Sequence, residues 1–306
     1  MNSLLTILLH LWWFVALAAF LPALGACFVL LLQEVAGGAW VQPVEGRLRW
    51  LARLLPLTAL GFVPLWLGWG TAFYWVSPEA ADQALVEARQ AYFNPSFFIA
   101  RSVAIFAGFA FVGWRLGSAS RKLFAAAPLL LALTVASLFF TVDWVMVRSP
   151  HWWSSGFPFT LILAGAMSAL GVSLFWSRTL GTKAAEAHRR PLGTLLFAFL
   201  NVFLYLGLIE FVITYAGDLP PKRGFYTERL GLLAGPVIFM GFAFGALPAF
   251  LNLLSLKGKT NSRRLRWSAG AVCLLAVCWA WWVVAPLTAW PDEESKEPRS
   301  AETSAS

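Results

Sequence analysis

Eight long runs of apolar residues, separated by short polar segments, dominate the sequence. Each run is close to or longer than the roughly 20 residues that a helix needs to cross a bilayer, at about 1.5 Å per residue. The runs lack the inside–outside alternation of barrel strands, and a helix satisfies its own backbone hydrogen bonds in lipid. We therefore predict an all-α integral membrane protein with about eight transmembrane helices, over residues 4–32, 54–76, 97–116, 123–147, 157–177, 192–216, 230–256 and 267–289.

Small residues recur every four positions inside some of these runs, and they predict where helices pack. Small side chains let two helix backbones approach closely, which favours association where lipid removes the hydrophobic driving force. We expect these residues to pack helices of this chain together rather than to form a dedicated dimer face. The two clearest sets are Gly165, Ala169 and Ser173, and Gly241, Gly245 and Ala249.

Composition and charge agree with a membrane protein. Of 306 residues, 59% are hydrophobic and 12% are charged, whereas soluble domains average about 45–50% and about 25%. The net charge is +8, but 15 of the 23 basic residues lie in alternate short loops between the runs. By the positive-inside rule these loops are cytoplasmic and both termini lie on the outer side of the membrane. We expect lipid, and not nucleic acid, around this chain.

Three charged residues lie inside apolar runs, where a charge is costly and marks a functional candidate. Arg101 is about one turn inside the third run and Asp143 about one turn from the end of the fourth. Glu210 is roughly 9 Å inside the outer end of the sixth run, at 1.5 Å per residue. All three belong to the predicted outer side. For Arg101 and Asp143 the competing interpretation is an ion pair at the helix ends, or a snorkelling arginine.

Glu210 has no charged partner nearby in sequence, so it needs a partner on another helix or must stay neutral. A protonatable acid at this depth is what a proton relay requires, and Asp143 is the second candidate for such a relay. The alternative is a neutral glutamic acid held by one hydrogen bond between helices.

The polar connection between the fourth and fifth runs contains His151 with Trp152 and Trp153 on one side and Trp144 shortly before. His151 is a third candidate for proton transfer and is able to donate to a quinone carbonyl. Arg101, Trp144 and Trp152 are the candidates for lining a quinone site. Interfacial tryptophans also form the ordinary aromatic belt of a membrane protein, and this alternative applies to His151 as well.

The sequence contains no pattern typical of a metal or a tightly held cofactor. Only three histidines are present, too few and too scattered for a bis-histidine haem, and the three cysteines lack metal-ligand spacing. Nucleotide-binding glycine motifs and the HExxH motif are missing too. We expect no metal and no covalent cofactor, with quinone or quinol as the remaining candidate ligand.

Several sequence blocks, in this order, resemble one protein family. They are Ala-Tyr-Phe-Asn-Pro-Ser-Phe-Phe-Ile-Ala-Arg, Asp-Trp-Val-Met with Pro-His-Trp-Trp-Ser-Ser, and Pro-Leu-Gly-Thr-Leu-Leu-Phe-Ala-Phe followed by Ile-Thr-Tyr-Ala-Gly-Asp-Leu-Pro, at 91–101, 143–146, 150–155, 191–199 and 213–220. The family is the second quinone-binding-type membrane subunit of alternative complex III, a quinol:cytochrome c oxidoreductase. That subunit is similar to the polysulfide-reductase membrane anchors.

The acidic tail over 291–306 is rich in Ser, Pro and Glu, so we expect it to be disordered. The resemblance implies two four-helix bundles, over 1–147 and 148–290, in the inner membrane of a bacterium with both termini periplasmic. It also implies a subunit without a redox centre, beside iron–sulfur, haem c and other membrane subunits. Its role would be a proton path or a wall of the quinone site during quinol oxidation. The chain departs from the family at Glu210-Phe211, where relatives carry Gln-Tyr. The alternatives are a structural anchor of such a complex and a stand-alone transporter.

Overall fold

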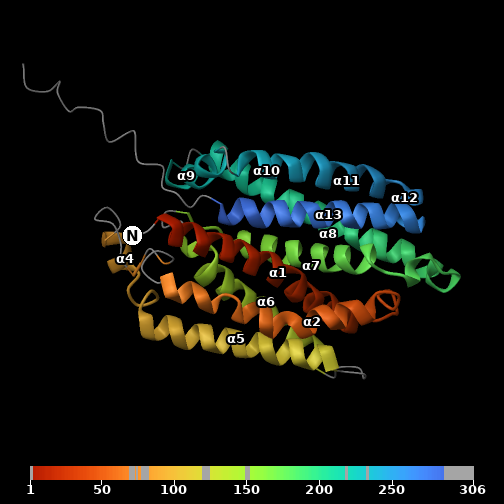
Figure 1. Ribbon diagram of the computed structural model, residues 1–306, viewed down its shortest axis with the longest axis horizontal. Coiled ribbons are helices and arrows are strands. Elements are labelled where there is room, and N and C mark those ends of the chain that lie inside the picture. The colour runs from red at the N-terminus through yellow and green to blue at the C-terminus, as the bar shows by residue number, and fades with distance from the viewer. Residues whose placement is uncertain are drawn as a thin grey trace, which may run out of the picture.

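A computed structural model describes residues 3–68, 73, 75–76, 83–118, 125–148, 152–217, 220–231 and 234–285. Every regular element in these residues is a helix, and eight of the helical segments are long and apolar enough to cross a membrane. The long helices run side by side along the long axis of the molecule (Figure 1). The expected all-α, multi-pass membrane architecture is confirmed.

The first half of the chain contributes four spanning segments, namely α1 (Ser3–Ala36), α2 (Glu45–Leu60) continued by the 3-10 helix η1 (Val63–Gly68), α5 (Pro95–Ser118) and α6 (Ala126–Trp144). The second half also contributes four spanning segments. Three are single helices, α7 (Phe157–Phe175), α8 (Glu186–Ala216) and α13 (Ser262–Val284). The fourth is a continuous rod made of α10 (Gly235–Met240), a π-helical turn (Gly241–Ala246) and α11 (Leu247–Leu254). Short helices lie at the ends, namely α4 (Gln83–Ala88), α9 (Pro220–Arg229), α12 (Leu256–Thr260) and 3-10 turns at Met146–Arg148, Thr179–Gly181 and Lys183–Ala185.

Helix contacts follow the two halves of the chain but also join them. In the first half α2 packs on α1 and α5, and α6 packs on both α1 and α5. In the second half α7 packs on α8 and α13, and α13 packs on the α10–α11 rod. The most extensive contact of all lies between α1 and α7. The halves therefore share one continuous core.

The α1–α7 contact depends on two glycines. A Cβ atom on Gly25 would overlap the carbonyl group of Gly165, so no larger residue fits there without moving a backbone. The small residue predicted at 165 is thus explained by packing within the chain. As a result α7 is the central helix. In its most apolar stretch 83% of the residues are buried, against 22% for α8.

The second span begins at Glu45, nine positions before the predicted start at residue 54, although this adds three arginines to the helix. Two of them bind the end of the neighbouring α5. Arg49 Nη1 donates to the Leu116 carbonyl at 2.8 Å and Arg53 Nε to the Gly117 carbonyl at 2.7 Å. The helix extends because these carbonyls, left without partners at a helix end, accept the charges.

The seventh span contains the π-helical turn that the sequence did not predict. Gly241 and Gly245 face α13, where a Cβ atom on Gly245 would lie 2.8 Å from the Ala271 carbonyl oxygen. The predicted role of these glycines in packing is confirmed. Pro248 follows directly, and its ring excludes an ordinary hydrogen bond to the carbonyl of Phe244. The wider turn is a known way to accommodate such a defect.

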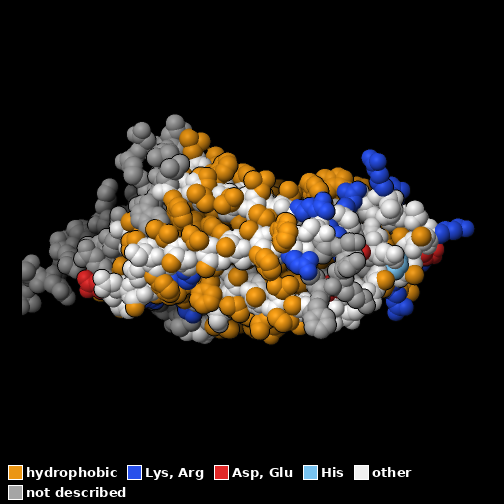
Figure 2. All heavy atoms as spheres, turned by 90° about the horizontal axis from the view of Figure 1, so that it is seen from below, with side chains coloured by type: hydrophobic (Ala, Val, Ile, Leu, Met, Phe, Trp, Pro, Cys, Tyr) orange, Lys and Arg blue, Asp and Glu red, His pale blue; other side chains and the backbone are white. Residues whose placement is uncertain are grey.

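The two ends of the molecule differ in charge. One end carries α4 and α9 and is called the α9 end; the opposite end, with α12, is called the α12 end (Figure 1). Figure 2 shows apolar side chains over the middle of the molecule, with most of the visible Lys and Arg toward the α12 end. An apolar belt between polar ends is the surface that a bilayer requires.

Candidate functional site

Arg101 and Asp143, two of the predicted site residues, form one ion pair at the α9 end. Arg101 lies in the second turn of α5 and Asp143 in the last turn of α6. Arg101 Nε donates to Asp143 Oδ2 at 2.6 Å, and Nη2 donates to Oδ1 at 2.8 Å. The side chains are only 9% and 0% exposed. Arg101 therefore does not snorkel, and the ion-pair interpretation of these two residues is confirmed.

Tyr92 completes this group, although the sequence did not single it out. Its hydroxyl donates to Asp143 Oδ1 at 3.0 Å, and its ring lies 3.8 Å from the Arg101 guanidinium carbon. Burial, together with the Asp143 carboxylate, holds the pKa of the Tyr92 phenol above its usual value. Phe97 lies on the guanidinium as well, at 4.5 Å. The available signal was the Tyr-Phe-Asn-Pro turn that starts α5.

Trp144 is fully buried beneath the ion pair, inside a cluster of aromatic rings. Five rings lie with centroids between 5.3 and 6.0 Å from the Trp144 ring, namely Phe62, Trp66, Phe73, Phe98 and Phe106. Such edge and offset contacts stabilise a core beyond simple burial. Trp144 therefore presents no exposed face to a ligand in this arrangement.

Glu210 lies on the inner face of α8, about one turn from Thr214 and two from Phe203, the buried residues on either side. Ser154 and Lys222 of α9 both lie near the Glu210 carboxyl group, the serine as a hydrogen-bonding group and the lysine as a nearby charge. Ser154 Oγ also accepts from the backbone N–H of Gly156 at 3.2 Å and of Phe157 at 3.1 Å. Because these amides occupy the lone pairs of the hydroxyl, Ser154 can act toward Glu210 only as a hydrogen-bond donor.

The short helix α9 covers this site with stacked side chains. Trp152, another predicted site residue, stacks on Phe225 with ring centroids 3.6 Å apart and planes 8° from parallel. The guanidinium carbon of Arg229 lies 3.7 Å from the centre of the Phe225 ring, and its Nη1 donates to the Phe225 carbonyl at 2.9 Å. All three side chains are buried. The stack holds α9 against the end of the bundle.

Tyr226, the residue after Phe225, brings a second phenol to Glu210. Its phenol lies near the Thr214 hydroxyl of α8, and both side chains are buried. Burial, followed by the charge of Glu210, raises the pKa of the Tyr226 phenol above its usual value. Asp143 and Glu210 thus each have a tyrosine nearby, the half-buried Tyr92 and the buried Tyr226.

Three consecutive residues connect the two groups. Trp152 stacks on Phe225, and Ser154 bonds to Glu210. Trp153 between them contacts the ring of Phe93, next to Tyr92, at 5.9 Å between centroids. The polar connection between the fourth and fifth predicted spans therefore contacts residues of both groups. His151, the remaining candidate, lies outside the described residues.

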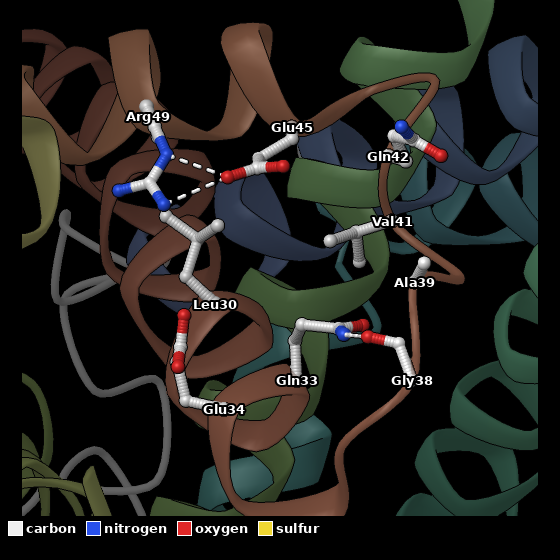
Figure 3. A pocket seen from close by; sticks show the side chains of 9 residues that line it. All are labelled: Leu30, Gln33, Glu34, Gly38, Ala39, Val41, Gln42, Glu45 and Arg49. Atoms are coloured by element: carbon white, nitrogen blue, oxygen red, sulfur yellow. Dashed lines mark hydrogen bonds and ion pairs between the residues drawn. The ribbon is translucent and has the colours of Figure 1, made fainter. Parts of the chain in front are cut away.

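A pocket of about 220 Å³ lies at the α12 end, between the end of α1 and the start of α2. In Figure 3 the Glu45 carboxylate reaches Arg49, at 2.7 Å, and Gln33 reaches the backbone at Gly38. Within the described residues the Gln33 side-chain oxygen has no hydrogen-bond partner, and none of the residues that line the pocket is a predicted site residue. In the part of the chain that the structure describes, no three His, Cys, Asp or Glu side chains come together as a metal site.

No protein-family model matches the chain, and no curated protein matches it either. Membership of the family therefore stays a prediction from the sequence blocks, and the two carboxylate sites at the α9 end are the basis for assigning a function.

Proposed function

We propose that this protein is a membrane subunit of a quinol-oxidising respiratory complex of the alternative complex III type, and that Glu210 passes protons toward the outer face. The supporting observation is the environment of Glu210, a carboxyl group beside the neutral hydroxyl of Ser154 at the end whose loops hold the minority of the basic residues. An acid with such a partner exchanges protons without breaking an ion pair. The positive-inside rule makes the α9 end the periplasmic side.

In this proposal the only chemical step that this subunit carries out is proton transfer. Oxidation of a quinol releases two protons with two electrons, and buried carboxylates are suitable acceptors for such protons. Glu210 would take a proton and release it past Ser154 and Lys222. Asp143, bound to Arg101, would hold the α5–α6 end in place beside the same connection. Redox centres would belong to the iron–sulfur and haem c subunits of the complex, with quinone bound at or near this chain.

A structural anchor of the same kind of complex is the second candidate. The observation that favours it is the Arg101–Asp143 ion pair, because a carboxylate engaged by two parallel bonds and a phenol has a clear packing role. A stand-alone transporter remains the third candidate.

The deciding experiment replaces Glu210 with Gln in the assembled complex. The amide keeps the size and the hydrogen bond to Ser154 but cannot exchange a proton, so turnover and proton release should fall about tenfold or more while assembly stays intact. The matched control is Glu34→Gln at the α12 end. Unchanged turnover in a correctly assembled Glu210→Gln complex would favour the anchor.

The composition of the native complex is tested first. The tagged protein is isolated in mild detergent, and its optical spectrum and accompanying proteins are analysed. Haem absorbance with an iron–sulfur protein and a second membrane subunit supports the respiratory proposal. A colourless single polypeptide that changes the accessibility of a solute would shift the assignment to a transporter.

A further inference from the structure

The outward face of α8 carries two polar side chains, Asn201 and Tyr205, among apolar ones. Its residues at three- and four-residue spacing share one face of the helix, namely Asn201, Tyr205, Leu208 and Val212. Tyr205 is 59% exposed and Leu208 is 62% exposed. Exposed leucine is normal against lipid, but tyrosine and asparagine on the same face are not explained by lipid contact.

The two polar residues lie near the middle of the membrane. The charged end of α8 is marked by Arg190 and the opposite interface by Tyr215, so the midpoint falls at residues 202–203. At 1.5 Å per residue, Asn201 is about 2 Å and Tyr205 about 4 Å from this midpoint. With a hydrocarbon core of about 30 Å, Tyr205 is roughly 11 Å from the nearer boundary. This distance is too long for a tyrosine side chain to span by snorkelling.

This face of α8 has more hydrogen-bond donors and acceptors than the described part of the chain provides partners for. Asn201 Nδ2 donates to the Phe197 carbonyl of its own helix at 2.7 Å, so its side-chain oxygen is the group still able to accept a hydrogen bond. Within the described residues, the hydrogen bonds do not include one from the Tyr205 hydroxyl or one to the Asn201 side-chain oxygen. Lipid tails offer neither donors nor acceptors, so both groups lose bonds that water would give them.

The neighbouring exposed face gives the contrast. In the α10–α11 rod, whose span Gly235–Leu254 has its midpoint at residues 244–245, the exposed large side chains nearest the middle are Phe242, Phe244 and Leu247, all apolar. A purely lipid-facing helix is built in that way. The polar pair on α8, at one-turn spacing and about 5–6 Å apart, instead matches the pattern by which membrane helices hydrogen-bond to each other.

We infer that the Asn201–Tyr205 face of α8 binds a transmembrane helix of a different subunit, one that carries a hydrogen-bonding side chain at mid-membrane. A residue that both donates and accepts, such as Ser, Thr, Asn or Gln, satisfies the Asn201 oxygen and the Tyr205 hydroxyl together. The inference rests on the proposed function for the identity of the partner, a membrane subunit of the same complex. It does not involve the Glu210 site, which lies on the inner face.

Site-specific photo-crosslinking in native membranes tests this face. A benzoylphenylalanine is placed at position 205, and in a control chain at Trp114, which is exposed on α5. The expected product from position 205 is an adduct to another subunit, with the crosslinked peptide in the middle of a membrane-spanning helix that contains a hydrogen-bonding residue. Adducts to lipid alone, to a second copy of this chain, or at the same sites as the Trp114 control would overturn the inference.

A conservative variant measures the contribution of the hydroxyl. Tyr205→Phe keeps the ring and removes the donor, so retention of the chain in the complex on native gels should weaken on the order of threefold. Trp114→Phe is the control and should leave retention unchanged. Equal retention of Tyr205→Phe and the unsubstituted chain would contradict the hydrogen-bonded contact.

The two proposals fail in different ways. If haem and iron–sulfur subunits accompany the chain but position 205 labels only lipid, the helix contact is wrong and the respiratory proposal stands. If position 205 labels a helix of another protein in a complex without redox subunits, the contact stands and the respiratory proposal is wrong.

Discussion

Asp143 and Glu210 are both acids near the α9 end of apolar helices, but the chain surrounds them differently. Asp143 accepts two bonds from a guanidinium and one from a phenol, inside a wall of aromatic rings. Glu210 accepts a bond from one serine, with a lysine nearby, on a helix that is mostly exposed. The Asp143 carboxylate is paired with the permanent positive charge of Arg101. The hydrogen-bonding neighbour of Glu210 is Ser154, whose hydroxyl group carries no charge.

This difference separates a structural acid from a candidate proton carrier. Arginine stays protonated at any ordinary pH, so a proton arriving at Asp143 must compete with a fixed cation. The Ser154 hydroxyl, which already accepts from two backbone amides, can donate to an oxygen atom of Glu210 whether the acid is charged or neutral. The comparison therefore assigns stability mainly to the first site and proton exchange to the second, and three substitutions separate these roles.

The largest effect is expected for Arg101→Met. The substitution leaves the Asp143 carboxylate buried without its cation, which costs about 3–5 kcal/mol of unfolding free energy. Thermal unfolding in detergent, followed with a thiol-reactive dye that reaches buried Cys27 only on unfolding, measures the loss. Lys222→Met beside Glu210 is the control and should change stability little. Similar melting temperatures for both variants would remove the structural distinction between the two sites.

A smaller effect is expected for Ser154→Ala. The variant removes the donor to Glu210 and the acceptor for two backbone amides before α7, so we expect a loss of about 1–2 kcal/mol. Turnover should fall in the same direction as in Glu210→Gln. Thr134→Val is the control, since the Thr134 hydroxyl only bonds to the Leu130 carbonyl of its own helix. A loss of stability without any change in turnover would limit Ser154 to packing.

The smallest effect is expected for Tyr92→Phe at alkaline pH. Because burial and Asp143 raise the pKa of the Tyr92 phenol in the folded protein, the folded state keeps its proton longer than the unfolded state. The stabilisation is complete below the ordinary tyrosine value of about 10 and is lost as the pH rises from there through the folded value. Melting temperatures between pH 8 and about 11 should therefore decline less steeply in the variant. Identical slopes would show that Tyr92 does not contribute.

Much of the architecture was predictable because the signal is local. A run of about 20 apolar residues determines a spanning helix without knowledge of its neighbours. For the same reason Arg101, Asp143 and Glu210 stood out as charges within apolar runs, near one end of the protein. Boundaries were less predictable, since the start of α2 at Glu45 depends on carbonyl groups at the end of α5 that accept its arginines.

The order of residues is enough to make this chain a helical membrane protein and to single out its unusual charges. Three-dimensional packing was needed to pair Arg101 with Asp143, 42 positions away, to add Tyr92, and to bring Ser154 to Glu210. These pairings depend on how each helix is rotated about its axis and which helices are neighbours. Uniformly apolar helices carry little information on either point, because lipid and protein core accept the same residues. Close contacts such as that between α1 and α7 at Gly165 set the rotation, and the polar partners follow from it.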